Sequence, residues 1–439
     1  MIDSKFKGRK FVSLILVAAL IATIVIIPAT AGVANAREDK VVLKVWAPKS
    51  VDTQKSVKEA ELRFQKQHPN IEIVRESFED PVAGKTKFLA AIKAGNAPDV
   101  GFVNLWWLPD FAMNGWLVPL DSFADQRLKA DILPPFIRSA SHGGKLYGLF
   151  SGTDCAVVVY RKDLLKKAGI KPPAPGEAWT QAQFIAAAKK LTKPGVWGLG
   201  INAKREGPTT YTQLPFFWMQ GGKILDKNGK PAFNSPAAVK SFQFYHDLVY
   251  KHKVTPPEIT SYGFDDVARG VAAGRFAMAL MGSWQPSNLE KMGNLKGKIG
   301  VMLYPVPKKG MRPTTIHGGW PMVILTKDKK KQEAAWKYIS YMFSTKVQSD
   351  MTKEQGNLPV RKSIYQNDAF FKTRWMKVFQ AQLMSAKHKP GDPIYMTVQD
   401  EYTIALIEVL MNKKTPKQAL RDAEDRVEKR ARAGGLWQW

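Results

Sequence analysis

The chain has 439 residues, of which 45% are hydrophobic, so it is long enough to bury more than one sizeable core. Its single cysteine, Cys155, excludes an intrachain disulfide. The formal net charge of +28 permits binding to anionic surfaces or anionic ligands. Because the basic residues are spread along the chain, we interpret them as a solvated surface attracted to anionic envelope components, with an acidic ligand as the alternative.

The N-terminal segment is typical of a secretory signal peptide. Basic residues within positions 5–10 precede the apolar run 11–27, and Ala34-Asn35-Ala36 fits the small-x-small cleavage rule. We predict cleavage after Ala36 and a periplasmic or secreted protein, for which nucleic acid is not an expected partner. The apolar run is also long enough for a retained membrane anchor, which stays the alternative. No cysteine lies at the cut, which excludes an anchor of the bacterial lipoprotein type.

The first part of the chain alternates between strand and helix patterns. Residues 41–45 and 71–73 alternate as strands, and an amphipathic helix is expected over 55–67 between them. A second helix ends at Gly95, before a strand over 101–103. The order βαβαβ predicts a parallel sheet with helices on both faces. Ligands of such sheets bind beyond the carboxyl ends of the strands, where the loops 48–52 and 104–107 would lie.

Residues 148–173 hold the stretch that organises the rest of the chain. A turn-prone GLFSGTD precedes an apolar run that ends at Tyr160, and a short helix follows until Gly169. We predict that this strand carries the chain from one lobe into another, and that the loop 151–154 lies in the cleft. The alternative is an ordinary core strand and helix. Cys155, followed by Ala156 and three valines, is expected to be a small buried thiol.

The remaining chain continues the α/β pattern. Caps, prolines and glycine stops predict further elements, which are a helix begun by the Thr180/Gln183 capping box, a helix begun at Ser235-Pro236, a helix over 265–273, a strand over 276–281, a strand after Gly318-Gly319-Trp320, a helix over 331–343 and a last helix begun at Thr415-Pro416.

Signatures of an enzyme are weak. The serine in 148–152 lacks the spacing of G-x-S-x-G, and the six histidines are scattered, so neither a serine hydrolase nor a zinc site is predicted. Residues 198–203 match G-x-G-x-x-A without a helix directly after them, and we interpret them as a turn. No cofactor is expected. A secreted carbohydrate-active hydrolase stays an alternative, because carboxylates and tryptophans also serve in such enzymes.

A series of motifs resembles a known family. The motifs are G-N-A-P-D-V at 95–100, G-W-L-V-P-L-D at 115–121, G-K-L-Y-G at 144–148, Y-R-K-D-L-L-K-K-A-G-I-K-P-P at 160–173, F-A-M-A-L-M-G-S-W at 276–284 and Q-G-N-L-P-V-R at 355–361. In this order they resemble the extracellular solute-binding proteins of ABC importers, the sugar-binding, maltose-binding-protein-like family. Arg161 replaces the asparagine usual in the family. Near Asp400, where maltose binders carry an aromatic residue, this chain has Gln399-Asp400-Glu401, which argues against maltose itself.

The resemblance implies an α/β fold of the two-lobe periplasmic-binding-protein type, type II-like, with three crossings between the lobes. The N-lobe would comprise residues 37–153 plus 319–367, and the C-lobe 154–318 plus 368–439. The implied function is a monomeric, non-enzymatic substrate-binding protein that delivers a sugar or oligosaccharide to the membrane subunits of an ABC permease by hinge closure. An anionic solute, such as a sugar acid or glycerol phosphate, is the alternative ligand.

The candidate ligand-binding residues combine aromatic rings with polar groups, because sugars stack on aromatic faces while their hydroxyls need polar partners. Several tryptophans lie in loops next to strands, where core packing is the alternative, whereas Trp336 on a helix stripe is expected in the core. The resemblance implies that Trp284 stacks on the ligand and that Asp154 binds its hydroxyls. The full candidate set is Ser50, Asn104, Trp106, Trp107, Asp154, Tyr211, Trp284, Gly319 and Trp320.

Overall fold

The computed structural model describes residues 40–79, 81–205, 207–292, 294–390 and 394–433. The predicted signal peptide and its cleavage site lie outside these residues. None of the helices in the described part is long and apolar enough to cross a membrane.

Most strands join one mixed sheet, with the order β2-β1-β3-β10-β6-β8-β7, β11 on β10 and β9 on β6. The strands are β1 (Val41–Pro48), β2 (Ile71–Phe78), β3 (Val100–Phe102), β4 (Ser141–His142), β5 (Lys145–Leu146), β6 (Leu149–Arg161), β7 (Trp197–Gly200), β8 (Phe276–Gly282), β9 (Ile299–Met302), β10 (Thr315–Ile324) and β11 (Ala386–Lys387).

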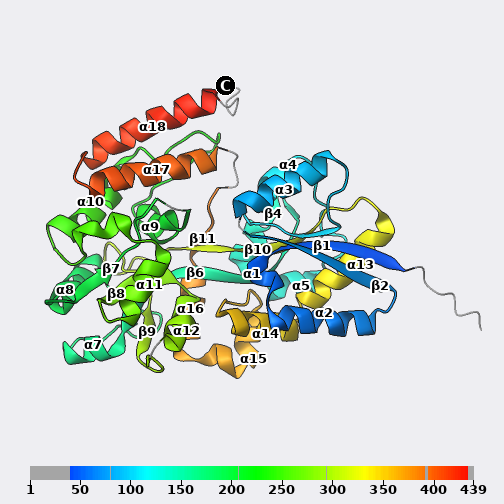
Figure 1. Ribbon diagram of the computed structural model, residues 1–439, viewed down its shortest axis with the longest axis horizontal. Coiled ribbons are helices and arrows are strands. Elements are labelled where there is room, and N and C mark those ends of the chain that lie inside the picture. The colour runs from blue at the N-terminus through cyan, green and yellow to red at the C-terminus, as the bar shows by residue number, and fades with distance from the viewer. Residues whose placement is uncertain (1–39, 80, 206, 293, 391–393, 434–439) are drawn as a thin grey trace, which may run out of the picture. The chain divides into compact units, whose positions relative to one another are not determined.

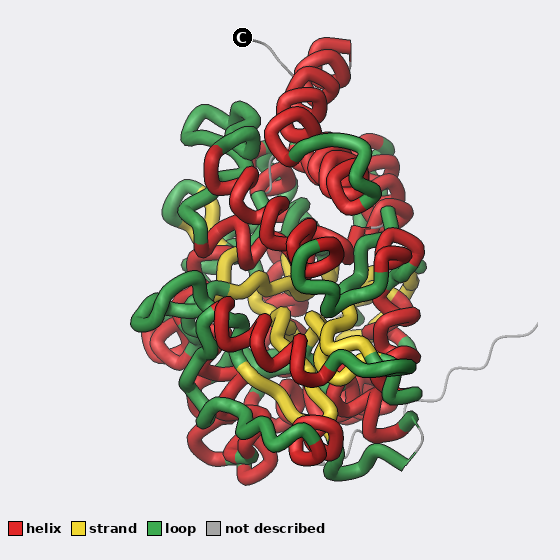
Figure 2. Tube along the Cα trace, turned by 90° about the vertical axis from the view of Figure 1, so that its left-hand side faces the viewer, coloured by secondary structure: helices red, strands yellow, loops and turns green. Residues whose placement is uncertain are grey.

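Helices surround the strands, as Figure 2 shows in red and yellow. They are α1 (Lys49–Asp52), α2 (Lys55–Gln67), α3 (Pro81–Lys93), α4 (Leu108–Met113), α5 (Gln126–Asp131), α6 (Pro134–Ser139), α7 (Lys162–Lys167), α8 (Gln181–Leu191), α9 (Gly207–Met219), α10 (Pro236–Tyr250), α11 (Phe264–Ala272), α12 (Gln285–Lys291), α13 (Lys329–Met342), α14 (Thr345–Gln355), α15 (Lys362–Asn367), α16 (Arg374–Leu383), α17 (Tyr395–Leu410) and α18 (Pro416–Ala433), with short 3₁₀ turns η1 (Pro257–Ser261) and η2 (Ala369–Lys372).

The predicted βαβαβ unit is confirmed. Strand β1 pairs in parallel with β2 and with β3, and α2 and α3 connect these strands. Helix α2 spans the predicted range, because its apolar positions Val57, Ala60 and Phe64 recur at helical spacing and are buried. The capping box at Thr180 and Gln183 also forms as expected.

The long strand β6 is the centre of the fold (Figure 1). Its second half is buried on both faces, which explains the continuous apolar run. Cys155, Val157 and Val159 pack into one hydrophobic cluster together with the β1–β3 unit. The alternate residues, such as Val158 and Tyr160, pack into a second cluster with α8–α10, α17 and α18. The chain therefore has two cores, and β6 contributes to both.

Two expectations about loops are wrong. Residues 151–154 are part of β6 rather than a loop, and Gly318-Gly319-Trp320 lies inside β10 rather than before it. These two segments pair with each other in antiparallel register, Thr153 with Gly319 and Asp154 with Gly318, with an irregularity between Gly319 and Pro321. Long-range pairing overrides the local turn preference of glycine and serine. The interpretation of 198–203 as a turn also fails at its start, because residues 198–200 belong to β7.

Candidate functional site

A cavity of about 400 Å³ lies where β6 and β10 pair, and segments distant in sequence meet around it. Its walls combine a carboxylate, two tryptophans, backbone of glycines and several hydroxyl and amide side chains. The lining residues are Ser50, Val51, Ser151, Gly152, Thr153, Asp154, Trp284, Gly319, Trp320, Gln355 and Asn357.

Asp154 is held at this cavity by its position on β6. Its Oδ1 accepts a hydrogen bond of 3.0 Å from the Gly318 backbone N–H and one of 2.5 Å from the Tyr211 hydroxyl. A Cβ on Gly318 would lie 3.0 Å from Asp154 Oδ2, so a larger residue there would crowd the carboxylate. Burial raises the pKa of Asp154, and the Tyr211 and Gly318 hydrogen bonds oppose that rise. Oδ2 receives no hydrogen bond from the described part of the chain.

Trp284 reaches the same cavity because β8 pairs with β6. The backbone N–H of Ser283 donates to the Cys155 carbonyl over 2.9 Å, and this fixes Trp284 one residue further along. The indole lies over Gly282, stacks on Phe264 at a centroid distance of 5.4 Å, and lies 5.7 Å from the Tyr211 ring. Trp284 remains only partly buried. Its ring is therefore a supported aromatic platform at the cavity wall.

Trp320, Gly319 and Ser50 also line the cavity. Gly319 has φ of 134°, and a Cβ there would lie 2.8 Å from the Gly152 carbonyl, so only glycine fits without strain. Trp320 follows on β10, and its ring lies 5.9 Å from that of Trp107. Ser50 lies on α1, which follows β1 directly, so residues 48–52 form the end of β1 and a short helix rather than the expected loop. Ser50 lines the cavity at the carboxyl end of β1.

Two lining residues, Gln355 and Asn357, were missed by the sequence reasoning. An isolated bridge between Thr153 and Leu358, with both hydrogen bonds at 2.8 Å, brings this stretch to the cavity. Gln355 Nε2 also donates to the Ser50 carbonyl over 2.8 Å. The Q-G-N-L-P-V-R motif was recognised, but nothing local in it indicates that its amides face a cavity.

Four candidates do not line this cavity. Trp107 is 4% exposed and packs against Phe78, Phe88 and Phe111 in the first hydrophobic cluster. Tyr211 is buried behind the cavity wall, where it contacts the lining residues Asp154 and Trp284. The other two are Asn104 and Trp106. The Asn104 side chain accepts a hydrogen bond of 3.2 Å from the Trp106 backbone N–H, which shapes the loop after β3.

Lys389 is a further buried group that the sequence reasoning missed. It is 1% exposed, and its Nζ donates to Gln399 Oε1 over 2.6 Å and lies 4.2 Å from the centroid of the Trp106 ring. Burial lowers the pKa of Lys389 to about 7, and the negative charge of Asp154 acts in the opposite direction. A lysine in the segment K-H-K-P gives no sequence signal of burial, so only the fold identifies it.

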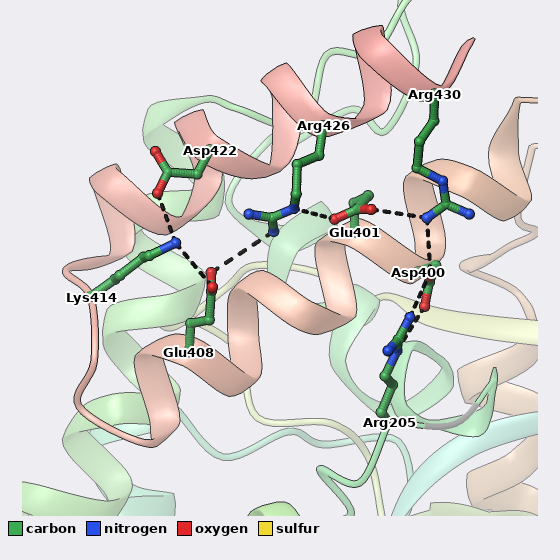
Figure 3. Close-up of polar contacts among 8 residues, drawn as sticks. All are labelled: Arg205, Asp400, Glu401, Glu408, Lys414, Asp422, Arg426 and Arg430. Atoms are coloured by element: carbon green, nitrogen blue, oxygen red, sulfur yellow. Dashed lines mark hydrogen bonds and ion pairs between the residues drawn. The ribbon is translucent and has the colours of Figure 1, made fainter. Parts of the chain in front are cut away.

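The residues after Gln399 have a structural role (Figure 3). Asp400 accepts hydrogen bonds from Arg205 over 3.1 Å and from Arg430 over 2.9 Å. Glu401 pairs with Arg426 and Arg430 of α18. The ion pairs of Arg426 and Arg430 hold α18 against α17. By the resemblance, a maltose binder of the family would carry an aromatic residue near position 400. The described residues include no group of three or more histidine, cysteine, aspartate or glutamate side chains that could hold a metal ion.

Comparison with known proteins defines the class. Residues 47–349 match the family model of the bacterial extracellular solute-binding proteins, and the chain belongs to this family. The fold is the two-lobe α/β fold of the maltose-binding-protein-like members. Because this match covers most of the chain, it confirms the family predicted from the motifs.

Individual relatives support the same class. A putative binding protein of Brucella abortus is 28% identical over 90% of this chain and 93% of its own length. A solute-binding protein of Thermotoga lettingae, solved with α-D-tagatose, has a TM-score of 0.73 and 28% identity, covering 89% of this chain and 99% of that one. A maltose-bound protein of T. maritima has a TM-score of 0.75 and 26% identity, with 89% and 99% coverage.

Proposed function

We propose that this protein binds a sugar or oligosaccharide in the cavity at the β6–β10 pair and delivers it to an ABC permease. One observation carries the proposal: a carboxylate oxygen and a supported tryptophan face the same cavity of about 400 Å³. A sugar ring presents apolar C–H groups and hydroxyls on one small molecule, and this pair of groups complements both. The solved relatives bound to tagatose and maltose support the same ligand class.

We assign roles to the candidate residues on this basis. Asp154 accepts ligand hydroxyls at Oδ2, while Tyr211 and Gly318 hold Oδ1. Trp284 and Trp320 supply the aromatic surfaces, and Gly319 keeps the backbone clear of side chain at the cavity wall. Ser50, Gln355 and Asn357 supply polar contacts, and Asn104, Trp106 and Trp107 shape the loop after β3 that supports this wall.

Ligand delivery in this proposal depends on hinge closure between an N-lobe of residues 37–153 plus 319–367 and a C-lobe of 154–318 plus 368–439. The boundaries at 153/154 and 318/319 are register partners in β6 and β10, so two of the three crossings would bend at one place. The cavity takes residues from both proposed lobes, so a ligand there favours the closed state by its contacts with each. The permease would recognise that closed state.

The proposal includes export and a binding role without catalysis. The leader is removed after Ala36, and the mature monomer works in the periplasm or outside the cell. The family is defined by solute binding, which supports a binder rather than a hydrolase. A turnover assay on glycans separates a binding protein from a hydrolase. At a protein concentration at which a hydrolase would digest the glycan completely, a binding protein leaves every glycan intact.

An anionic solute, such as a sugar acid or glycerol phosphate, is the second candidate ligand. The buried ammonium of Lys389, whose charge interacts with Asp154, favours this alternative because it offsets the carboxylate charge near the cavity. A thermal-shift screen over monosaccharides, oligosaccharides, uronates and sugar phosphates decides between the two. We expect neutral sugars to raise the melting temperature most. A rise with anionic ligands alone would select the alternative, and no rise with any sugar would contradict the proposal.

A further inference from the structure

One end of the fold carries a dense group of lysines, which we call the lysine face. Its members come from three segments: α7 with the residues that follow it, the end of α8 with the turn after it, and the turn before β9. They are Lys162, Lys166, Lys167, Lys171, Lys189, Lys190, Lys193, Lys296 and Lys298. All but Lys298 are exposed, and within the described part of the chain none forms an ion pair with a carboxylate. In Figure 1, α7 and α8 lie at the left-hand edge.

Hydrogen bonds and one close approach join these segments into one surface. The Lys162 backbone N–H donates to the Lys298 carbonyl over 2.7 Å, and Lys162 Nζ donates to the Gly297 carbonyl over 3.2 Å. These bonds place the turn before β9 beside the start of α7. At the other end of α7, a Cβ on Gly169 would lie 3.8 Å from Lys190 Nζ. The end of α8 is therefore next to the end of α7.

Two carboxylates beside this face, Asp163 and Glu290, already have partners. Asp163 accepts two hydrogen bonds from Arg161, at 2.9 and 2.7 Å, and Glu290 accepts the Gly297 backbone N–H over 2.7 Å. The pKa of nearby His252 is lowered, first by burial and then by the positive charge of Lys189, while the negative charge of Asp247 acts in the opposite direction. Uncompensated positive charge therefore dominates the face. Met292, 36% exposed at the end of α12, adds an apolar group beside it.

We propose that the lysine face binds the surface of an anionic phospholipid bilayer. The charge is spread over three segments rather than gathered around a hollow, and the cavity at the β6–β10 pair lies elsewhere. A lysine ammonium is a compact point charge suited to a diffuse anionic surface, whereas an arginine fork suits a defined carboxylate or phosphate. Each lysine near such a surface contributes roughly fivefold in binding. The inference does not depend on which solute occupies the cavity.

Vesicle co-sedimentation of the full mature chain tests the proposal. Vesicles contain phosphatidylcholine alone or phosphatidylcholine with phosphatidylglycerol, at about 50 mM and about 500 mM salt. The test variant carries Lys166→Glu, Lys167→Glu and Lys190→Glu. A control variant carries Lys58→Glu, Lys66→Glu and Lys93→Glu, which are exposed lysines on α2 and α3 and give the same change in net charge. Circular dichroism and melting temperature check that both variants fold.

We expect the wild type to bind only vesicles with phosphatidylglycerol and to lose this binding at high salt. The lysine-face variant should lose at least about 100-fold in partitioning, while the control variant stays within about fivefold of the wild type. Equal loss in both variants would show that net charge alone is responsible and would overturn the proposal. It would also be overturned if the wild type failed to bind anionic vesicles.

Discussion

The Tyr211 hydroxyl donates a 2.5 Å hydrogen bond to Asp154 Oδ1. Helix α9, which packs in the second hydrophobic cluster, therefore fixes a carboxylate of β6, the strand that contributes to both clusters. Tyr211→Phe removes this bond and keeps the ring against Trp284 and Phe264. We expect ligand affinity to fall by about fivefold to thirtyfold with little change in melting temperature. Isothermal titration of folded protein measures this, and unchanged affinity would show that Tyr211 does not position Asp154 for the ligand.

Trp284→Ala should remove an aromatic platform of the binding site, because the partly buried ring lines the cavity. We expect ligand binding to weaken by about tenfold or more while the fold is kept. Trp336→Ala is the matched control. Trp336 stacks on Phe123, with the two ring centroids 5.6 Å apart, and it does not line the cavity. The control should lower the melting temperature and keep the affinity. The opposite pattern would place Trp284 in the core.

Lys389 should make the free energy of unfolding depend on pH. Its folded pKa of about 7 lies below the ordinary 10.5, so the unfolded chain binds a proton that the folded chain lacks between these values. Through this group, stability is fully present above pH 10.5 and is lost as the pH falls to about 7. Lys389→Met should therefore flatten the rise in stability over this window relative to wild type. Denaturant unfolding at pH 7, 8.5 and 10 checks this.

An exposed lysine provides the control for that experiment. Lys58→Met removes a lysine whose side chain is solvated in the folded protein. Its pH dependence of unfolding should match that of the wild type. If Lys389→Met also matches the wild type over the whole window, burial does not lower the pKa of Lys389, which contradicts this prediction.

Processing of the leader gives a prediction by mass alone. The positive charges, apolar run and small-residue site within residues 1–36 predict a mature protein that begins at Arg37. Intact-mass spectrometry of the exported protein should give the mass of residues 37–439. Retention of residues 1–36 would favour an N-terminal anchor.

Elements that are determined by nearby residues could be predicted from the sequence. Helix α2 and the capping box at Thr180 follow from apolar spacing and cap chemistry, and both were predicted. The strand character of residues 151–154 was not predictable from composition, because it depends on pairing with β10, more than 160 residues away, as the 164-residue separation of Gly318 and Asp154 shows. Lys389 illustrates the same limit, since its burial arises from Trp106 and Gln399 and not from its neighbours in sequence.

The carboxylate of Asp154 is the group on which the proposed function most depends. Asp154→Asn keeps the acceptor that binds Tyr211 and Gly318 and removes the charge at Oδ2. Because burial raises the pKa of Asp154, ionisation costs folded stability as the pH rises, so the variant should be at least as stable as the wild type at pH 7. A loss of affinity would then report on ligand recognition and not on folding.

Isothermal titration of the wild type and Asp154→Asn, with the best ligand from the thermal-shift screen, measures this directly. We expect a neutral sugar to bind the variant more weakly by about 1.5–3 kcal/mol, because hydrogen bonds to a charged acceptor are stronger than those to a neutral amide. An anionic ligand would instead bind the variant more tightly, since a like charge has been removed. Unchanged affinity for every ligand would show that Asp154 does not face the bound solute, and this would contradict the account.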